Sequence, residues 1–315
     1  MRDESLSSVH PSKLLVVRLS AFGDVIHTIP AVVALCDALP QIEIAWAVEP
    51  AYAELVELVA GVRAIRVSLK KWSLARIREA MRRVRGFDDA IDFQGLIKSA
   101  LIARVSGARL RYGFARDVIR EKPAAWFVNR PITIERSSHV VEWNLALARA
   151  LAPAIAGVPE VDFSPFADDP SGKLGAFANR IVFLPGAGRP EKQWPAERFA
   201  ELARRLGSDV LLACGPGEEP IGRAIGAELA PPTTFRELAF LLRGARLVVG
   251  GDTGPLHLAA ALGVPVAGLY GPTDPARNGP YGQLGNVIES FSTTKSMQSI
   301  DVDDVLRLVL KINSR

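Results

Sequence analysis

The stretch at residues 250–275, GGDTGPLHLAAALGVPVAGLYGPTDP, contains the repeating pattern that decides the fold. The apolar residues 247–249 before it predict a buried strand, which leads through the turn Gly250-Gly251-Asp252-Thr253-Gly254 into a helix predicted at 255–262. A second strand and a second polar turn follow at 264–269 and 271–275. In α/β proteins a strand, a glycine-rich turn and a helix start often bind phosphate, because backbone N–H groups and the positive end of the helix dipole face the ligand. We therefore expect an anion-binding turn here, with Asp252 and Thr253 able to contact a ribose or a sugar.

The same alternation of strand and helix runs through the rest of the chain. We predict further strands at 13–19, 42–48, 64–67, 89–93, 180–184 and 209–213, and helices at 25–39, 52–59, 73–84, 96–105, 195–206, 221–229 and 302–312, with one more helix ending near 242. Alternation of this kind favours parallel sheets with right-handed crossovers. A length of 315 residues suits two domains, and residues 152–173 are rich in Pro, Gly, Ser and Asp. We expect two Rossmann-like α/β domains, at 1–160 and 174–315, joined by a linker.

Composition narrows the class of protein without naming a function. The two cysteines, Cys36 and Cys214, form no disulfide framework and no zinc spacing, so we expect free thiols in a reducing cytoplasm. The first ten residues are not a signal peptide, and no run of ~20 apolar residues offers a membrane span. The four histidines, His10, His27, His139 and His257, show no metal-ligand spacing, so we expect no metal site. A net charge of +4 and a pI of about 9.2 allow an anionic partner.

A second candidate phosphate turn follows the strand predicted at 180–184. Gly186-Ala187-Gly188 supplies backbone donors, and Lys192 lies just before a helix start, where a lysine can hold a pyrophosphate. A solvated surface lysine fits the same pattern. His257 lies four residues after Thr253, which puts both on one face of a helix beside the first anion turn.

The first strand ends in the turn Ser20-Ala21-Phe22-Gly23-Asp24, which has one glycine and lacks the dinucleotide fingerprint G-x-G-x-x-G. Ligands of open α/β sheets bind at the carboxyl ends of the strands. A carboxylate at Asp24 could therefore take a proton from an incoming hydroxyl. From these residues alone, an aspartate at a helix N-terminus is the simpler interpretation. His27, one turn later, either orients Asp24 or lines the helix.

Basic residues are concentrated in the first half. Residues 61–85 contain nine of them against one acidic residue, Glu79, and residues 104–122 contain six against two. Such a surface favours phosphates, acidic sugars or anionic lipid headgroups. Nucleic acid is the competing anion, but no nucleic-acid motif accompanies the stretch. A solvated helix face is the alternative without a ligand.

Four motifs together resemble the ADP-heptose:lipopolysaccharide heptosyltransferases, glycosyltransferase family 9. They are VVRLSAFGDVIHTIPA at 16–31, DFQGLIKSA at 92–100, LPGAGRPEKQWP at 184–195 and the stretch at 250–275. The resemblance covers nearly the whole chain from Lys13. The second motif is more similar to heptosyltransferase I, which adds the first heptose to the Kdo of lipid A, than to heptosyltransferase II.

The resemblance implies a GT-B fold, in which two Rossmann-like domains face each other across a cleft. The donor would bind the second domain and the acceptor the first, and helix 302–312 would be free to pack on the first domain. It implies an inverting, metal-independent transfer of heptose from ADP-heptose to Kdo, without a cofactor and with Asp24 as general base. The implied donor residues are Lys192, Gly186, Ala187, Gly188, Asp252, Thr253, Gly254 and His257, with Glu218 or Glu219 for the ribose because the turn length there differs. Heptosyltransferase I commonly has threonines where this chain has Ala187 and Gly188, so only backbone contacts are expected there.

The implied acceptor side comprises Ser20, Gly23, Lys70, Lys71, Gln94, Lys98 and Arg120. The expected partners are an ADP-sugar, an anionic lipid A acceptor and the cytoplasmic face of the inner membrane, with no nucleic acid. Three alternatives stay open. They are heptosyltransferase II, another sugar-nucleotide enzyme of this fold such as a non-hydrolysing epimerase, and a non-catalytic protein that binds a nucleotide sugar or an anionic glycan.

Overall fold

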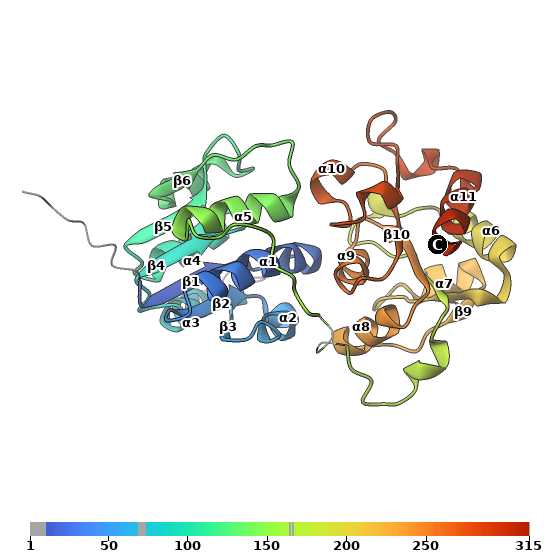
Figure 1. The fold of residues 1–315 in the computed structure, drawn as a ribbon, viewed down its shortest axis with the longest axis horizontal. Coiled ribbons are helices and arrows are strands. Elements are labelled where there is room, and N and C mark those ends of the chain that lie inside the picture. Colours follow the sequence, from blue (N-terminus) through green and yellow to red (C-terminus); the bar gives the residue numbers. More distant parts are fainter. Residues whose placement is uncertain (1–10, 69–73, 164, 166, 315) are drawn as a thin grey trace, which may run out of the picture. The chain divides into compact units, whose positions relative to one another are not determined.

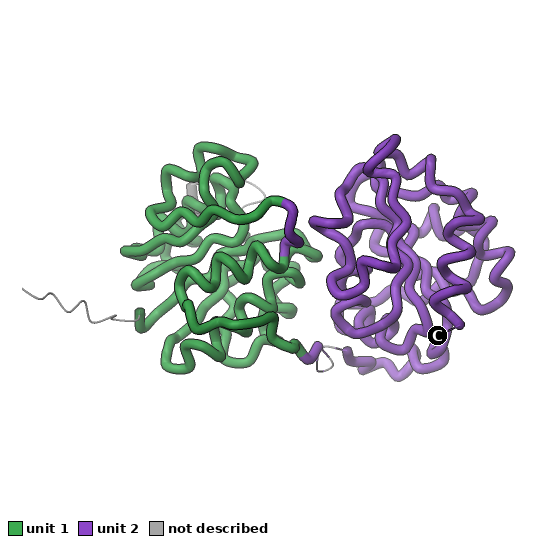
Figure 2. Tube along the Cα trace, turned by 45° about the horizontal axis from the view of Figure 1, so that its top comes forward, with its two compact units in different colours: residues 1–136, 141–161 green, residues 137–140, 162–315 purple. Residues whose placement is uncertain are grey.

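The computed structural model describes residues 11–68, 74–163, 165 and 167–314. The chain divides into two compact units. The first is Met1–Arg136 with Val141–Val161, and the second is Ser137–Val140 with Asp162–Arg315 (Figure 2). We describe each unit by itself.

The first unit is a six-stranded parallel sheet of order β3-β2-β1-β4-β5-β6 with helices on both faces (Figure 1). Its elements are β1 (Lys13–Val17), α1 (Phe22–Ala38), β2 (Glu43–Val48), η1 (Pro50–Tyr52), α2 (Ala53–Glu57), β3 (Val62–Arg66), α3 (Leu74–Arg83), β4 (Asp89–Asp92), α4 (Ile97–Val105), β5 (Leu110–Phe114), η2 (Lys122–Phe127), β6 (Arg130–Ile132) and α5 (Val140–Leu151).

Alternating residues of the central strands bury both faces of this sheet. Leu15 and Val17 of β1 pack in one core cluster with Ala80 of α3 and Ile102 of α4. The other face is covered by α1 and α5. There the side-chain amide of Asn144 donates to the carbonyl of His27 at 2.9 Å. The buried residues of α1 are mostly apolar, and the acidic residue of its first turn is Asp24.

The second unit repeats the architecture, with a parallel sheet of order β12-β11-β10-β7-β8-β9. Its elements are η4 (Leu174–Phe177), β7 (Ile181–Leu184), η5 (Pro190–Lys192), α6 (Ala196–Leu206), η6 (Gly207–Asp209), β8 (Val210–Leu212), α7 (Glu219–Ile225), β9 (Glu228–Leu229), α8 (Phe235–Arg243), β10 (Leu247–Gly251), α9 (Gly254–Ala261), β11 (Val266–Tyr270), α10 (Pro275–Asn278), η7 (Leu284–Asn286), β12 (Val287–Glu289), η8 (Met297–Ser299) and α11 (Val302–Asn313).

The C-terminal helix α11 belongs to the core of the second unit. Its residues Val305 and Val309 are fully buried in one cluster with Phe199 of α6 and Leu247 of β10. The sequence had left open that this helix packs on the first domain. Within the second unit the apolar stripe of α11 packs against α6 and β10, and packing on the first domain stays a prediction.

The expected fold class is confirmed: both units are doubly wound parallel α/β sheets, as in GT-B proteins. Three boundaries differ from the prediction, and the first two of them matter for the site. Helix α1 begins at Phe22, so Asp24 lies in its first turn rather than before the helix. Strand β10 continues through Gly251, so the glycine pair extends the strand. The predicted helix 221–229 ends instead at Gly226, whose φ of +77° stops it, and residues 228–229 form the edge strand β9.

Each sheet reverses its strand order once, between β1 and β4 in the first unit and between β7 and β10 in the second. Chain segments leave in opposite directions at such a point, and open α/β sheets bind ligands beside it, at the carboxyl ends of the two strands. Asp24 follows β1 and Gln94 follows β4, whereas Lys192 follows β7 and Asp252 follows β10. Among the described residues, no helix has the length and apolar character required to span a bilayer.

Candidate active site

The second unit brings Lys192, Asp252 and His257 together at its strand reversal. Asp252 is the first residue after β10, and its side chain is only 7% exposed. Its Oδ2 atom lies 2.5 Å from Nζ of Lys192, and its Oδ1 atom lies 3.0 Å from Nε2 of His257. Three residues predicted for the donor side thus form one hydrogen-bonded group, with Asp252 at its centre.

Within this group, Lys192 and His257 stabilise the negative charge of Asp252. Burial by itself would raise the pKa of Asp252, but the hydrogen bond and charge of His257 and the charge of Lys192 outweigh it and lower that pKa to about 2. Asp252 is therefore ionised throughout the physiological range. A lysine Nζ has three N–H donors, so Lys192 can keep its contact with Asp252 and donate to a further anion.

Helix α9 begins directly beside this group. Thr253 is its N-cap residue, but its side chain makes no capping hydrogen bond, and the buried Oγ1 atom has no partner among the described residues. The first helical residues, Gly254 and Pro255, carry no side-chain donor or acceptor. The positive end of the α9 dipole and the Thr253 hydroxyl are thus both available to an anionic or hydroxyl-bearing ligand.

Two glycines let backbone or a carboxylate approach closely. A Cβ at Gly251 would lie 2.9 Å from the carbonyl oxygen of Lys192, so the lack of a side chain allows β10 to touch the turn that carries Lys192. A Cβ at Gly186 would lie 1.9 Å from the carboxyl carbon of Glu218. The carboxylate of Glu218 is held there by the backbone N–H of Gly215, which donates at 2.7 Å.

The structure thereby separates the two candidate glutamates. Glu218 lies over the Gly186 turn, whereas Glu219 is exposed at the first residue of α7. Ala187 is half-buried and its carbonyl is 3.5 Å from the side-chain amide of Gln193, while Gly188 is exposed with open space around it. The donor residues of the second unit therefore line two neighbouring turns, after β7 and β10, with Glu218 added from the turn after β8.

In the first unit, Asp24 is paired with a buried arginine that the sequence had not indicated. Nη2 of Arg18 lies 2.6 Å from Oδ1 of Asp24, and the side chain of Arg18 is 8% exposed. The other carboxylate oxygen, Oδ2, accepts from the backbone N–H of Ala21 at 3.2 Å. Ser20 and Gly23 are half-buried in the same turn.

Gln94 joins the strands of the first reversal. Its side-chain oxygen accepts from the backbone N–H of Leu19 at 2.9 Å, which fixes the end of β1 against the end of β4. Its backbone N–H donates to the buried carboxylate of Asp92 at 2.9 Å, and Ser99 donates to the other oxygen at 2.9 Å. Burial raises the pKa of Asp92 to about 6, although hydrogen bonds from Gln94, Ser99 and Gly95 and the charge of Arg18 limit the rise.

Two polar residues outside the prediction lie near Asp24 and Lys98. Glu49, buried after β2, is 3.9 Å from Nζ of Lys98. Tyr52 has a raised pKa because of burial and the nearby carboxylates of Glu49 and Asp24. Both Arg18 and Glu49 follow an apolar strand directly. A charged residue at the end of a buried run is the only sequence signal that they carry, and by itself it also marks an ordinary strand end.

The remaining predicted acceptor residues are less closely grouped. Arg120 is exposed; the next residue, Glu121, accepts from the backbone N–H of Ile97 at 2.8 Å, which puts this segment beside the start of α4. Lys70 and Lys71 lie outside the described residues. The His27 side chain is buried in α1. Within the described part of the chain, no group of three or more His, Cys, Asp or Glu side chains could hold a metal ion.

The chain forms two Rossmann-like units, and the second gathers a lysine, a helix N-terminus and the carboxylate of Glu218 at its strand ends. This arrangement is typical of one class of protein, the glycosyltransferases of the GT-B fold. The model of glycosyltransferase family 9 (heptosyltransferase) matches residues 74–306, and the chain belongs to this family. It is 36% identical over 296 residues to lipopolysaccharide heptosyltransferase 1 of Pseudomonas aeruginosa, covering 86% of this chain and 82% of the relative.

Solved structures agree with this assignment. The chain is similar to the E. coli heptosyltransferase WaaC with ADP, with a TM-score of 0.79, 28% identity and coverage of 95% of this chain and 99% of that one. It is also similar to WaaC with ADP-2-deoxy-2-fluoro heptose, with a TM-score of 0.74, 28% identity and the same coverage. The GT-B fold and the glycosyltransferase class are therefore established on both sequence and structure.

Proposed function

We propose that this enzyme transfers heptose from ADP-heptose to a Kdo residue of the lipopolysaccharide inner core. The observation that carries the proposal is the group formed by Lys192, Asp252 and His257 at the start of α9. It combines a cation and a helix N-terminus for a diphosphate with a fixed carboxylate for sugar hydroxyls. The names of the relatives, lipopolysaccharide heptosyltransferase 1 and WaaC with ADP, support the same donor and product class.

The reaction is written as a single displacement. An acceptor hydroxyl loses its proton to Asp24, and its oxygen forms a bond to the anomeric carbon of the donor. The bond from that carbon to the β-phosphate oxygen breaks, and ADP leaves with the electron pair from the opposite face, so the configuration at the anomeric carbon inverts. Lys192 and the N-terminus of α9 stabilise the charge that develops on the diphosphate. In this proposal they do so without a metal ion.

The remaining donor contacts follow from the same geometry. Glu218 would accept hydrogen bonds from the ribose hydroxyls, while the backbone of Gly186, Ala187 and Gly188 would face the phosphates. Lys98 and Gln94, at the carboxyl end of β4, would contact the acid groups of the acceptor. A donor panel of ADP-heptose, other ADP-sugars and UDP-sugars with Kdo-lipid A, read by nucleotide release in the presence and absence of EDTA, tests the proposal. We expect nucleotide release with ADP-heptose and with none of the other donors. We expect EDTA to leave this release unchanged.

Other outcomes of this panel would replace the proposal. Nucleotide release only with an acceptor that already carries one heptose would indicate heptosyltransferase II. Binding of ADP-heptose without release would indicate a non-catalytic binding protein. Epimerisation of the donor without an acceptor would indicate a different sugar-nucleotide enzyme.

We also propose that the first unit touches an anionic membrane surface on the cytoplasmic side, where a lipid-anchored acceptor would be found. Ion pairs neutralise part of the basic stretch, since Arg63, Arg66 and Arg83 pair with Glu43, Glu57 and Glu79. The exposed arginines without such a pair among the described residues include Arg78, Arg82, Arg85 and Arg104.

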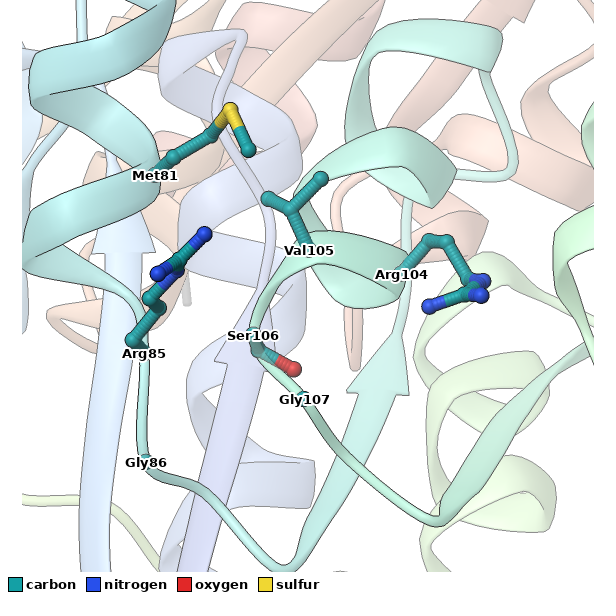
Figure 3. Close-up of a pocket in the computed structure, with 7 residues that line it drawn as sticks. All are labelled: Met81, Arg85, Gly86, Arg104, Val105, Ser106 and Gly107. Atoms are coloured by element: carbon teal, nitrogen blue, oxygen red, sulfur yellow. The ribbon is translucent and has the colours of Figure 1, made fainter.

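Two features support this surface. A shallow cavity of about 420 Å³ lies between the ends of α3 and α4, where Met81 faces Val105 and where Arg85 and Arg104 lie at the rim (Figure 3). Beside α4, η2 carries Trp126, which is 75% exposed. Arginine and tryptophan together are favoured at the headgroup level of anionic bilayers. Cosedimentation with phosphatidylglycerol vesicles should fall for the double variant Arg85→Glu/Arg104→Glu and stay unchanged for Arg223→Glu, an exposed arginine of the second unit.

A further inference from the structure

The arginine that precedes the proposed base is held at both of its terminal nitrogens, while its buried Nε has no hydrogen-bond partner among the described residues. Nη2 of Arg18 contacts Oδ1 of Asp24 at 2.6 Å, and Nη1 donates to the carbonyl of Phe93. The backbone carbonyl of Arg18 accepts from Nε1 of the fully buried Trp46 at 3.1 Å. Because its residue is only 7% exposed, Arg18 has one orientation and no open route to a substrate.

Arg18 also lies between two carboxylates of different character. Asp92 is fully buried at the end of β4, and its oxygens are occupied by Ser99 and by the N–H groups of Gln94 and Gly95. Asp24 has a side chain that is 38% exposed. The guanidinium thus compensates a carboxylate behind it and holds a carboxylate that faces outward.

The two oxygens of Asp24 are therefore not equivalent. Oδ1 is held by a cation that does not lose its proton at any pH a protein tolerates. Oδ2 has a single, longer contact, the 3.2 Å hydrogen bond from the N–H of Ala21. Because the cation contacts Oδ1, the less strongly held Oδ2 is the oxygen expected to take a proton from the acceptor.

We infer that Arg18 is a positioning residue, which acts through Asp24 by fixing Oδ1 and thereby presenting Oδ2 to the acceptor hydroxyl. The inference rests on the proposed function, in which Asp24 is the base. In the transfer, the O–H bond of the acceptor breaks and a bond from the proton to Oδ2 of Asp24 forms, while Oδ1 stays on Arg18. The other titratable groups around this carboxylate are Tyr52 and Glu49 on the segment after β2, Lys98 on α4 and Asp92 behind Arg18.

The test compares Arg18→Met, Arg18→Lys and Asp24→Asn, with Arg111→Met as the matched control. Arg111 is a half-buried arginine of the same unit that donates to the carbonyls of Phe127 and Ala108, away from Asp24. For Arg18→Met we expect kcat to fall about 100-fold, because a carboxylate displaced by about 1 Å loses catalysis on that scale. KM for the donor should stay unchanged.

The charge-conserving variant Arg18→Lys should show an intermediate kcat, since it retains the charge but not the two-pronged geometry. It also keeps the test decisive if Arg18→Met fails to fold, which ADP binding and a thermal melt would reveal. Wild-type kcat in a folded Arg18→Met protein would overturn the inference, as would equal kcat values for the Lys and Met variants. Near-normal turnover of Asp24→Asn would instead remove the base itself, and with it the proposed mechanism.

Discussion

Nζ of Lys192 lies 2.5 Å from Oδ2 of Asp252, although the two residues are 60 positions apart in the sequence. The contact joins the turns that follow β7 and β10, the two strands at which the second sheet reverses its order. It explains how a lysine with a side chain only 17% exposed is kept in place without a ligand. In the proposed function, a bound diphosphate would share this cation with Asp252.

Removing the cation should weaken binding of the nucleotide directly. We expect Lys192→Met to raise the Kd for ADP roughly 10- to 100-fold, because a hydrogen bond to a charged group contributes about 1.5–3 kcal/mol. Titration calorimetry with ADP measures the effect. Lys311→Met, an exposed lysine of α11, is the control and should bind ADP as the wild type does. Equal affinity of the two variants would show that Lys192 is not a phosphate ligand.

The low pKa of Asp252 predicts a definite pH dependence of stability. A carboxyl group whose pKa is about 2 in the folded protein, against 3.8 ordinarily, stabilises the fold above pH 4 and loses this contribution as pH falls toward 2. The stability difference between the wild type and Asp252→Asn should therefore narrow by about 1 kcal/mol between pH 5 and pH 3. Urea unfolding at the two pH values measures it. A difference that stays constant would contradict the assigned ion pairs.

Gly186 and Glu218 should behave as one functional element. A methyl group on residue 186 would occupy the position of the Glu218 carboxylate, so Gly186→Ala and Glu218→Ala remove the same group from the site. We expect each variant to lose the preference for ADP over 2′-deoxy-ADP, and the double variant to be no weaker than either single one. Competition binding with the two nucleotides measures this. Additive losses, or a preference that survives Glu218→Ala, would assign the ribose to another residue.

Close backbone contact makes Gly251 a second sensitive glycine. Its substitution by alanine would bring Cβ within 2.9 Å of the Lys192 carbonyl, and a backbone atom cannot swing aside as a side chain can. We expect Gly251→Ala to lower the free energy of unfolding by about 1–3 kcal/mol, as overpacking does, and to weaken ADP binding as the Lys192 turn shifts. Gly188→Ala, in open space, is the comparison and should be near wild type in both measurements. Similar behaviour of the two variants would disprove the tight contact.

Much of the fold follows from apolar runs that the sequence displays openly. Central strands such as β1 and β10 are buried on both faces and read as continuous hydrophobic stretches. The edge strands have no continuous hydrophobic stretch. Strand β6 has the sequence RPI, and β9 has two exposed residues, Glu228 and Leu229. Their assignment depends on pairing with a neighbour that is distant in the sequence, so local pattern could not predict them.

The site residues also divide into those that the sequence could predict and those that it could not. Lys192, Asp252 and His257 could be proposed because each lies at a strand end or a helix start, and the structure brings them together. Arg18 and Glu49 could not be proposed from the sequence, because a charged residue after an apolar run looks like the end of a strand until its partner is known. Glu218 and Glu219 were equivalent in sequence; only the approach of Glu218 to Gly186 distinguishes them.

The central claim is that heptose moves from ADP-heptose to a Kdo hydroxyl with Asp24 as the base. Mass spectrometry of the lipid product from ADP-heptose and Kdo-lipid A, compared for the wild type and Asp24→Asn at matched ADP affinity, tests it most directly. We expect the wild type to add one heptose per acceptor and the variant to do so roughly 100- to 10,000-fold more slowly, as loss of a general base predicts. An unchanged lipid mass with the wild type, or equal rates for the two proteins, would contradict the account.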